Sequence, residues 1–399
     1  MSHPISDRLN RLSESQTIAM ARKSRELRSC GIDVISLSLG EPDFNTPDFI
    51  KEAAKKAIDD NFSSYTAVAG YQELREAICL KLKRDNGLDY TPDQIVTSTG
   101  AKQSLANVLL ALIDPGDEVL LLAPYWVSYK EMVKLAEGTP VEVLAGVEQE
   151  YKVSAEQIDT AITPKTKMVM FNSPSNPTGS VYSKKEVDAI VKVFEKHPHV
   201  YIMSDEIYEH INFTEEGQVS LAAYPSIYDR VITVNGLSKG FAMTGWRFGY
   251  IAAAKWIAEA CDKMQGQMTS ATCSITQKAA ETAMRADASV THEMRDAFKA
   301  RRDKMIPPFN EIPGFKTPVP KGAFYFFPDV RGVFGKRKGD RVIEDANGLS
   351  MYLLDEAHVA TVPGEAFGAP GCLRLSYAAA EDVLIEAIQR IKKAIEELS

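Results

Sequence analysis

The stretch MVMFNSPSNPTGSVYSKKEVDAIVKVFEKHPHVYIMSDEIY, residues 168–208, holds the unit on which the fold depends. It opens with the apolar run Met168–Phe171 and closes with a second one, Val200–Met203. Between them, apolar side chains at 187, 190, 191 and 194 have the spacing of one face of a helix. Short, fully apolar runs are typical of strands that are buried on both faces. The order strand, helix, strand therefore predicts an α/β fold with a mostly parallel sheet.

Apolar runs of the same kind recur through the middle of the chain. The further examples are Glu118–Ala123, Val231–Val234 and Phe248–Ala253. The two ends of the sequence instead combine helical patterns with a few strand-like runs, which are Ala323–Phe327, Val359–Val362 and Leu373–Tyr377. We therefore expect a large α/β domain of residues 45–294 and a small α+β domain built from residues 1–44 and 295–399. A helix from about Thr291 to Met305 is expected to connect them and to end before Pro307 and Pro308.

Composition argues against several classes of protein. The formal net charge of -8 argues against a nucleic-acid surface, which needs clustered Lys and Arg. The longest apolar stretches are strand-sized, too short for a membrane span, and Met1–Arg8 lacks the apolar segment of a signal peptide. The five cysteines are scattered without a C-x-x-C pair, as expected of free thiols in a reducing compartment. We expect a cytoplasmic protein that binds neither nucleic acid nor membrane. No metal site is expected either, because no cluster of ligands joins His197 and His199.

The residues that follow the apolar runs are the candidates for chemistry, because open α/β sheets bind ligands at the carboxyl ends of their strands. These candidates are Gly100, Ala101, Lys102, Trp126, Asn176, Asp205, Tyr208, Ser238 and Lys239. Each has an ordinary structural interpretation: Gly100–Lys102 a turn, Asp205 a helix cap, Lys239 a surface residue. Arg247 and Arg374 are different, because both stand among apolar residues, where an arginine needs an anion.

Taken together, the candidates match the requirements of pyridoxal phosphate chemistry. Lys239 would hold the cofactor as a Schiff base, and Asp205 would keep its ring nitrogen protonated. Tyr208 and Asn176 would hydrogen-bond the ring oxygen, and Trp126 would stack on the ring. The phosphate would lie at the helix that starts after Gly100, held by Arg247, while Arg374 would pair with the substrate α-carboxylate.

Four motifs in this order and spacing resemble the class I aminotransferases of fold type I: residues 173–179 (SPSNPTG), 204–210 (SDEIYEH), 238–247 (SKGFAMTGWR) and 374–377 (RLSY). Within that family, Gly40–Phe44, Pro124–Ser128 and Ser15–Thr17 are most similar to bacterial aspartate aminotransferases of the Iβ branch. The resemblance extends nearly end to end. It implies a large domain with a mostly parallel seven-stranded sheet, a small α+β domain, and a homodimer.

The resemblance also assigns roles to residues. It implies that Tyr65 reaches the cofactor phosphate of the partner subunit, and that Lys239 moves the proton from the substrate Cα. Four residues match substrate-contacting positions: Gly40, Trp126, Asn176 and Arg374. Three others match the group that binds the distal carboxylate of an acidic substrate: Lys102, Ser15 and Thr17. The activity implied is transfer of the amino group of L-aspartate to 2-oxoglutarate by a ping-pong mechanism.

Two departures from the family pattern stand out. The lysine loop often reads S-x-S-K, but here Gly236 replaces the first serine, which puts cofactor affinity in doubt. Members that also use prephenate often carry a lysine where Ser13 and Glu14 stand here, and this change favours aspartate.

Other functions remain open from the residues. An aromatic amino acid or prephenate is the main alternative substrate on the same scaffold. Residues 236–240 also match the G-x-S-x-G motif of serine hydrolases, with Ser238 as nucleophile, but a second apolar strand follows too soon for the required helix. Regulators that use this fold as a ligand sensor carry a basic extension, which this acidic chain does not show.

Overall fold

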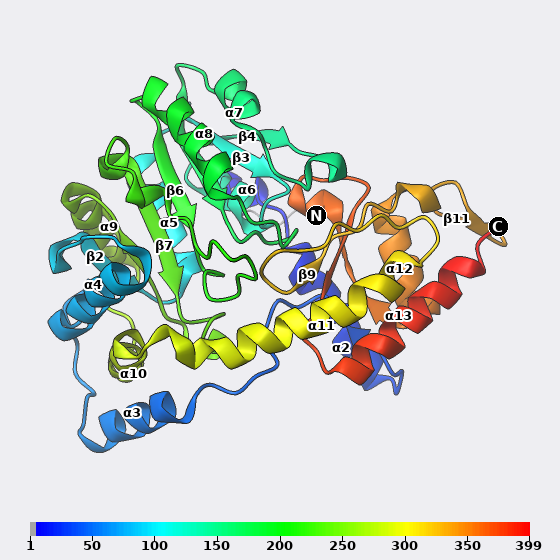
Figure 1. The fold of residues 1–399 in the computed structure, drawn as a ribbon, viewed down its shortest axis with the longest axis horizontal. Helices are drawn as coiled ribbons and strands as arrows, with labels where there is room; N and C mark the ends of the chain where they lie inside the picture. Colours follow the sequence, from blue (N-terminus) through cyan, green and yellow to red (C-terminus); the bar gives the residue numbers. More distant parts are fainter. Residues whose placement is uncertain (1–4) are drawn as a thin grey trace.

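A mixed sheet of seven strands lies at the centre of the larger part of the molecule (Figure 1). The computed structural model describes residues 5–399. In sequence order, the strands are β2 (Ile95–Ser98), β3 (Glu118–Ala123), β4 (Thr139–Leu144), β5 (Thr166–Asn172), β6 (Tyr201–Asp205), β7 (Val231–Gly236) and β8 (Gly249–Ala252). Their order across the sheet is β2-β8-β7-β6-β5-β3-β4, and β8 runs antiparallel to both of its neighbours. The predicted mostly parallel, seven-stranded sheet is confirmed.

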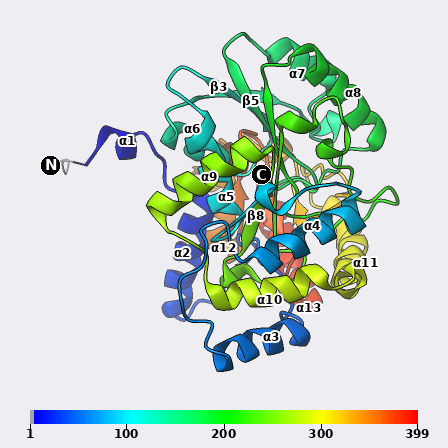
Figure 2. The same cartoon turned by 90° about the vertical axis from the view of Figure 1, so that its left-hand side faces the viewer.

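Helices cover both faces of this sheet because successive strand residues point to opposite sides. Val119 and Leu121 pack with α5 (Ala101–Leu112), α6 (Ser128–Leu135) and α9 (Lys255–Met268). Leu120 belongs to the core on the other face, with residues of α4 (Gln72–Asn86), α7 (Ala155–Ala161), α8 (Lys184–Lys196) and α10 (Ser274–Arg285). Helix α3 (Asp48–Asp59) packs against α10 at the edge of the molecule (Figure 2). Burial on both faces is the reason that the central strands are mostly apolar.

The second part of the molecule has its own core, formed by both ends of the chain. Strands β9 (Tyr325–Phe326), β13 (Val362–Pro363) and β14 (Leu373–Ser376) form an antiparallel sheet, and β1 (Ile35–Ser36) pairs in parallel with β12 (Val359–Ala360). The hairpin β10–β11 (Arg337–Lys338 and Arg341–Val342) lies nearby. The helices here are α2 (Gln16–Ser29), α12 (Ala346–Glu356) and α13 (Glu381–Glu396), whereas the short helix α1 (Asp7–Asn10) contacts α6 of the sheet region. The predicted domain limits themselves stay a prediction, and residues 1–4 lie outside the described part.

Helix α11 (His292–Asn310) runs from the sheet region to α12 and α13 (Figure 1). The prediction that this helix ends before Pro307 and Pro308 is wrong, since both prolines lie inside its last turn. Proline removes a helical hydrogen bond, but Ile306 and Phe309 on either side of the pair are buried in the second core. We attribute the continuation of the helix to this packing. Within residues 5–399, no helix has the length and apolar character needed to cross a membrane.

Candidate active site

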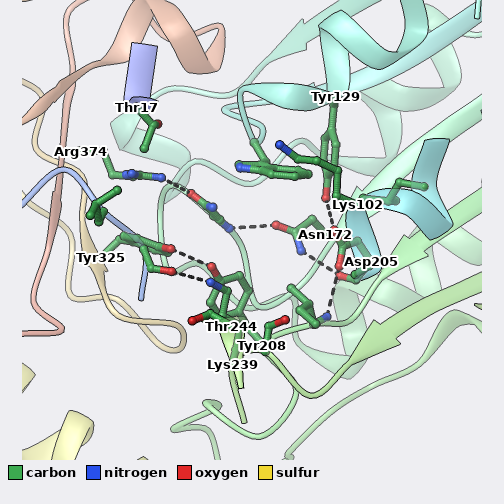
Figure 3. Close-up of a pocket in the computed structure, with 18 of the residues that line it drawn as sticks. Thr17, Lys102, Tyr129, Asn172, Asp205, Tyr208, Lys239, Thr244, Tyr325 and Arg374 are labelled. Carbon is green, nitrogen blue, oxygen red and sulfur yellow. Dashed lines mark hydrogen bonds between the residues drawn. The ribbon is translucent and has the colours of Figure 1, made fainter. Parts of the chain in front are cut away.

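A cavity of about 430 Å³ opens at the carboxyl ends of the parallel strands, where the second core meets the sheet (Figure 3). This volume is within the usual range for sites that bind small molecules. The predicted site residues that line it are Thr17, Gly40, Ala101, Lys102, Trp126, Asn176, Asp205, Tyr208, Ser238, Lys239, Arg247 and Arg374. Most of them follow strands that end at the same edge of the sheet, whereas Thr17, Gly40 and Arg374 reach the cavity from the part of the molecule that holds the second core.

Lys239 lies on the loop that connects the antiparallel strands β7 and β8. Its side chain is partly buried, and its Nζ donates a hydrogen bond to the Gly40 carbonyl oxygen at 2.5 Å. Burial lowers the pKa of Lys239 to about 8, and the nearby Arg374 and Arg247 act in the same direction. A lowered pKa makes the neutral, nucleophilic amine more abundant near neutral pH. The chain after Lys239 forms a turn rather than a helix, so the context that a serine hydrolase requires around Ser238 is absent from this part of the described structure.

Asp205 ends strand β6 and is buried at the base of the cavity. Its Oδ2 accepts a hydrogen bond from the Tyr129 hydroxyl at 2.6 Å, and its Oδ1 accepts one from the Ile207 amide at 3.2 Å. Burial raises the pKa of Asp205 to about 6, while the Tyr129 hydrogen bond opposes this rise. Asn172 on β5 donates to the Asp205 carbonyl oxygen at 2.8 Å and accepts from the Asn176 amide at 2.9 Å. These bonds join the ends of two adjacent strands.

The N-terminus of α5 lines the same cavity as Lys239 and Arg247. The first amides of a helix have no carbonyl partner within it, and the helix dipole favours negative charge there. A Cβ at Gly100 would come within 2.5 Å of Arg247 Nη2, so the glycine lets the guanidinium approach the helix. The Ser238 side chain lines the same cavity. Arg247 precedes β8 and, although the sequence places it among apolar residues, it is exposed.

Position 236 shows why one expected hydroxyl is missing from this site. A Cβ at Gly236 would meet the Phe248 carbonyl oxygen at 2.6 Å and the Gly249 Cα at 3.0 Å, because β7 and β8 approach closely there. Backbone atoms cannot move aside as a flexible side chain can. A serine therefore has no room at position 236, and Ser238 is the hydroxyl residue of this loop that lines the cavity.

Arg374 on β14 is fully buried and reaches the cavity from the second core. Its Nη1 donates to Asn176 Oδ1 at 3.0 Å and its Nη2 to the Ser38 carbonyl oxygen at 2.5 Å. Its guanidinium also lies over the Tyr325 ring, 4.7 Å from the centroid. None of these partners is negatively charged, and its Nε has no hydrogen-bond partner among residues 5–399. A buried arginine with neutral partners is prepared to bind an anionic group of a ligand.

Lys102 lies on the wall between this cavity and a second one of about 570 Å³. Its Nζ stands over the Trp126 ring, 4.7 Å from the centroid, and burial lowers the pKa of Lys102. The Thr17 hydroxyl is buried without a hydrogen-bond partner in residues 5–399. Ser15 lines the second cavity rather than the first. Tyr65 is fully exposed and does not reach the site within one chain.

Several residues that line the cavity were not predicted from the sequence. They are Leu39, Leu105, Tyr129, Asn172, Ile207, Thr244 and Tyr325. The Tyr325 hydroxyl is 2.7 Å from the Tyr208 hydroxyl, so it fixes the end of that side chain (Figure 3). Asn172 directly precedes the motif of residues 173–179, and Thr244 lies inside the motif of residues 238–247, so the sequence could have identified both as candidate site residues. Tyr129 directly follows the quoted segment Pro124–Ser128, and Tyr325 lies inside the strand-like run Ala323–Phe327, but only the folded chain shows their contacts.

This fold and this cavity define a pyridoxal-phosphate-dependent enzyme of fold type I. The family model for aminotransferase class I and II matches residues 32–391, and the chain belongs to that family. The chain is 49% identical over 394 residues to an aspartate/prephenate aminotransferase of Cereibacter sphaeroides, covering 97% of this chain and 98% of the relative. It is 46% identical to a bifunctional aspartate aminotransferase and glutamate/aspartate-prephenate aminotransferase of Petunia hybrida, covering 98% and 82%.

Solved structures agree with this assignment. The aspartate aminotransferase from Rhizobium meliloti superimposes with a TM-score of 0.96 at 40% identity, covering all of both chains. The Thermus thermophilus aspartate aminotransferase with maleate superimposes with a TM-score of 0.92 at 39% identity, covering 98% of this chain and all of that one. The predictions of family, fold class, enzyme class and cofactor are confirmed.

Pyridoxal 5′-phosphate is the cofactor of this family, and the residues of the cavity fit it. When bound, it supplies an aldehyde carbon that takes up an amino group and a ring that accepts electrons. The cavity offers the matching groups: an amine with a lowered pKa at Lys239, an acid without a cationic hydrogen-bond partner at Asp205, and a helix N-terminus with Arg247 for a phosphate. Glycine at position 100 leaves the space that this phosphate site needs.

Proposed function

We propose that this protein is an aspartate aminotransferase, which transfers the amino group of L-aspartate to 2-oxoglutarate in two successive half-reactions. The observation that carries the proposal is the pair of cations in one cavity, Arg374 and Lys102 (Figure 3). Arg374 is buried among neutral partners and suits an α-carboxylate. Lys102, which lines the same cavity as the unpaired Thr17 hydroxyl, suits a second carboxylate. Amino acids with two carboxylates are therefore favoured over those with one.

The proposed roles of the other residues follow from their chemistry. Lys239 would hold the cofactor covalently, and its Nζ would take the proton from the substrate Cα. Asp205 would keep the ring nitrogen protonated, Tyr208 and Asn176 would hydrogen-bond the ring oxygen, and Trp126 would stack on the ring. Gly100, Ala101, Ser238 and Arg247 hold the phosphate. Gly40 completes the substrate pocket, and Ser15 with Thr17 supports Lys102.

Titration of the purified holoenzyme with substrates tests this proposal. Adding L-aspartate is expected to abolish the visible absorbance band of the bound cofactor, and 2-oxoglutarate is expected to restore it. In Lys102→Met, kcat/KM for aspartate should fall about tenfold or more, because a hydrogen bond to a charged group is lost, while that for phenylalanine changes less. Lys134→Met is the matched control, since Lys134 lines only the second cavity and pairs with Glu131.

A band that phenylalanine or alanine discharges but aspartate does not would contradict the substrate assignment and leave the class of reaction intact. An equal loss of kcat/KM for aspartate and phenylalanine in Lys102→Met would contradict the role of Lys102 in binding a distal carboxylate.

Prephenate is a second candidate substrate, as the amino acceptor. Two observations favour it: the names of the relatives from Cereibacter sphaeroides and Petunia hybrida include prephenate, and the second cavity adjoins the site at Lys102. This cavity would give room to a substrate larger than aspartate. However, Glu14 lines it and is paired with Arg22, which places an acid where an anionic substrate would enter. Comparing kcat/KM for prephenate with that for 2-oxoglutarate decides between the two acceptors.

We also propose that the active enzyme is a cytoplasmic homodimer in which Tyr65 contacts the cofactor phosphate of the partner subunit. A tyrosine that is fully exposed in the single chain suits a contact made across an interface. All five cysteines are free, in keeping with a reducing compartment. We expect sedimentation at twice the 44.0 kDa of one chain. A fully active species with the mass of a single chain would contradict the role of Tyr65.

A further inference from the structure

Tyr129 contacts two of the residues proposed to hold the cofactor. It lies in the first turn of α6, and its side chain is 1% exposed. Its hydroxyl donates to Asp205 Oδ2 at 2.6 Å (Figure 3). Its ring meets the Trp126 ring edge-on, with 5.6 Å between the centroids. A short hydrogen bond to a carboxylate inside a low-dielectric cavity is a strong interaction. Tyr129 thus fixes both an acid and an aromatic ring of the site.

The surroundings of Asp205 differ from those of Glu209, an equally buried acid four residues further along the chain. Glu209 forms an ion pair with Lys81 and accepts hydrogen bonds from Asn86 and Asn235, and these contacts lower its pKa to about 2. The charge of Glu209 is therefore neutralised within the protein. Asp205 receives its side-chain hydrogen bond from a neutral tyrosine instead, so its negative charge stays available to a cationic ligand group.

The hydroxyl of Tyr129 suits this task because it stays protonated. Burial and the nearby Asp205 raise the pKa of Tyr129 well above its ordinary value, so its hydroxyl remains a donor at neutral pH. The other titratable groups that face Asp205 are Lys239 on the loop after β7 and Tyr208 on its own loop. Lys239 is engaged with the Gly40 carbonyl oxygen, and Tyr208 with Tyr325. Tyr129 is therefore the side chain that hydrogen-bonds the Asp205 carboxylate among the described residues.

We propose that Tyr129 is a positioning residue for the transamination reaction: its hydroxyl holds the Asp205 carboxylate in place and ionised, so that Asp205 binds the protonated ring nitrogen of the cofactor. The inference rests on the proposed role of Asp205. A neutral donor orients the carboxylate without cancelling its charge, whereas a lysine or arginine at this position would compete with the ring nitrogen. Removing the hydroxyl leaves a buried carboxylate with one fewer hydrogen bond and shifts Asp205 toward its neutral form.

The test is Tyr129→Phe, which removes one oxygen atom. We expect the affinity of the cofactor-free protein for pyridoxal phosphate to fall about 10- to 100-fold, the effect typical of a lost hydrogen bond to a buried charged group. The acid limb of the pH profile of kcat/KM should also move to higher pH. The sign follows because loss of a donor raises the pKa of Asp205, so its ionised form requires a higher pH.

The matched control is Tyr352→Phe, which removes a hydroxyl that is equally buried but distant from the cavity. Tyr352 donates to the Ala394 carbonyl oxygen at 2.7 Å, between α12 and α13. Thermal unfolding of both variants measures the stability effect of a lost buried hydroxyl. We expect Tyr352→Phe to leave cofactor affinity and the pH profile unchanged.

A double-mutant cycle with Asp205→Asn separates positioning from general structural effects. If Tyr129 acts through Asp205, then Tyr129→Phe should add little once the carboxylate is gone. An equal loss of affinity in both backgrounds, or an unchanged affinity and pH profile in the single variant, would overturn the proposal. Failure of the unmodified protein to bind pyridoxal phosphate would contradict the cofactor site as a whole, which is a different result from an unaffected Tyr129→Phe.

Discussion

Replacing Lys239 with alanine is expected to lower kcat for transamination by at least about 10⁴-fold, the upper range for loss of a positioned acid–base group. Lys239 is the amine with a pKa lowered to about 8 in the cavity, and we assign it both the covalent bond to the cofactor and the proton transfer at the substrate Cα. Its loss therefore removes two functions. Steady-state kinetics with aspartate and 2-oxoglutarate, together with borohydride trapping of the cofactor on the protein, measure the two effects.

Lys255→Ala is the control, because Lys255 on α9 is exposed and pairs with Asp93 at the surface. We expect it to behave as the unmodified enzyme. Cofactor that is still trapped covalently in Lys239→Ala, or activity that remains within about tenfold of the unmodified enzyme, would show that another group carries the reaction.

The second large effect is expected for Arg374→Lys, with kcat/KM for aspartate reduced about 100-fold or more and KM raised. Lysine keeps the positive charge but loses the planar fork that can bind a carboxylate through two hydrogen bonds. It also cannot keep both present contacts of the guanidinium, to Asn176 and to the Ser38 carbonyl oxygen, while it binds substrate. Loss of a buried, hydrogen-bonded charge contact typically costs about 2–5 kcal/mol, which corresponds to this range.

Arg390→Lys provides the comparison, because Arg390 is a surface residue paired with Asp33 and Glu386. Cofactor affinity should be unchanged in both variants, since the proposed contact of Arg374 is to the substrate. A normal KM for aspartate in Arg374→Lys would indicate that another group binds the α-carboxylate. Reduced cofactor affinity in that variant would show instead that Arg374 contributes to the cofactor site.

The sequence was sufficient for the sheet and for most of the cavity. Apolar runs such as Met168–Phe171 identified buried strands, and the ends of parallel strands converge at one edge. Polar residues that follow such runs, among them Asp205 and Asn176, could therefore be assigned to a common site from the sequence alone. All that this required was the local order of residues along the chain.

The sequence did not determine contacts that depend on how distant segments pack. Pro307 and Pro308 predicted a helix end, but packing of the flanking residues in the second core kept α11 helical through both. The missing hydroxyl at Gly236 was a departure from the family pattern until the close approach of β7 and β8 showed that no side chain fits there. In the first case, packing against distant residues overrode the local rule that proline ends a helix. In the second case, packing against a distant strand explained a departure from the family pattern.

The chemistry of the site also depends partly on the sequence and partly on the tertiary structure. The sequence determined which groups are present: an amine at Lys239, a carboxylate at Asp205 and a guanidinium at Arg374. Only the tertiary structure determined the ionisation of these groups, because pKa values and charge pairing depend on burial and on the nearest partners. Tyr129 comes to Asp205 from α6, 76 residues away in the chain, and Asn176 comes to Arg374 across 198 residues. A motif records the identity of a side chain, whereas the dielectric and the hydrogen bonds around it exist only once the chain has folded.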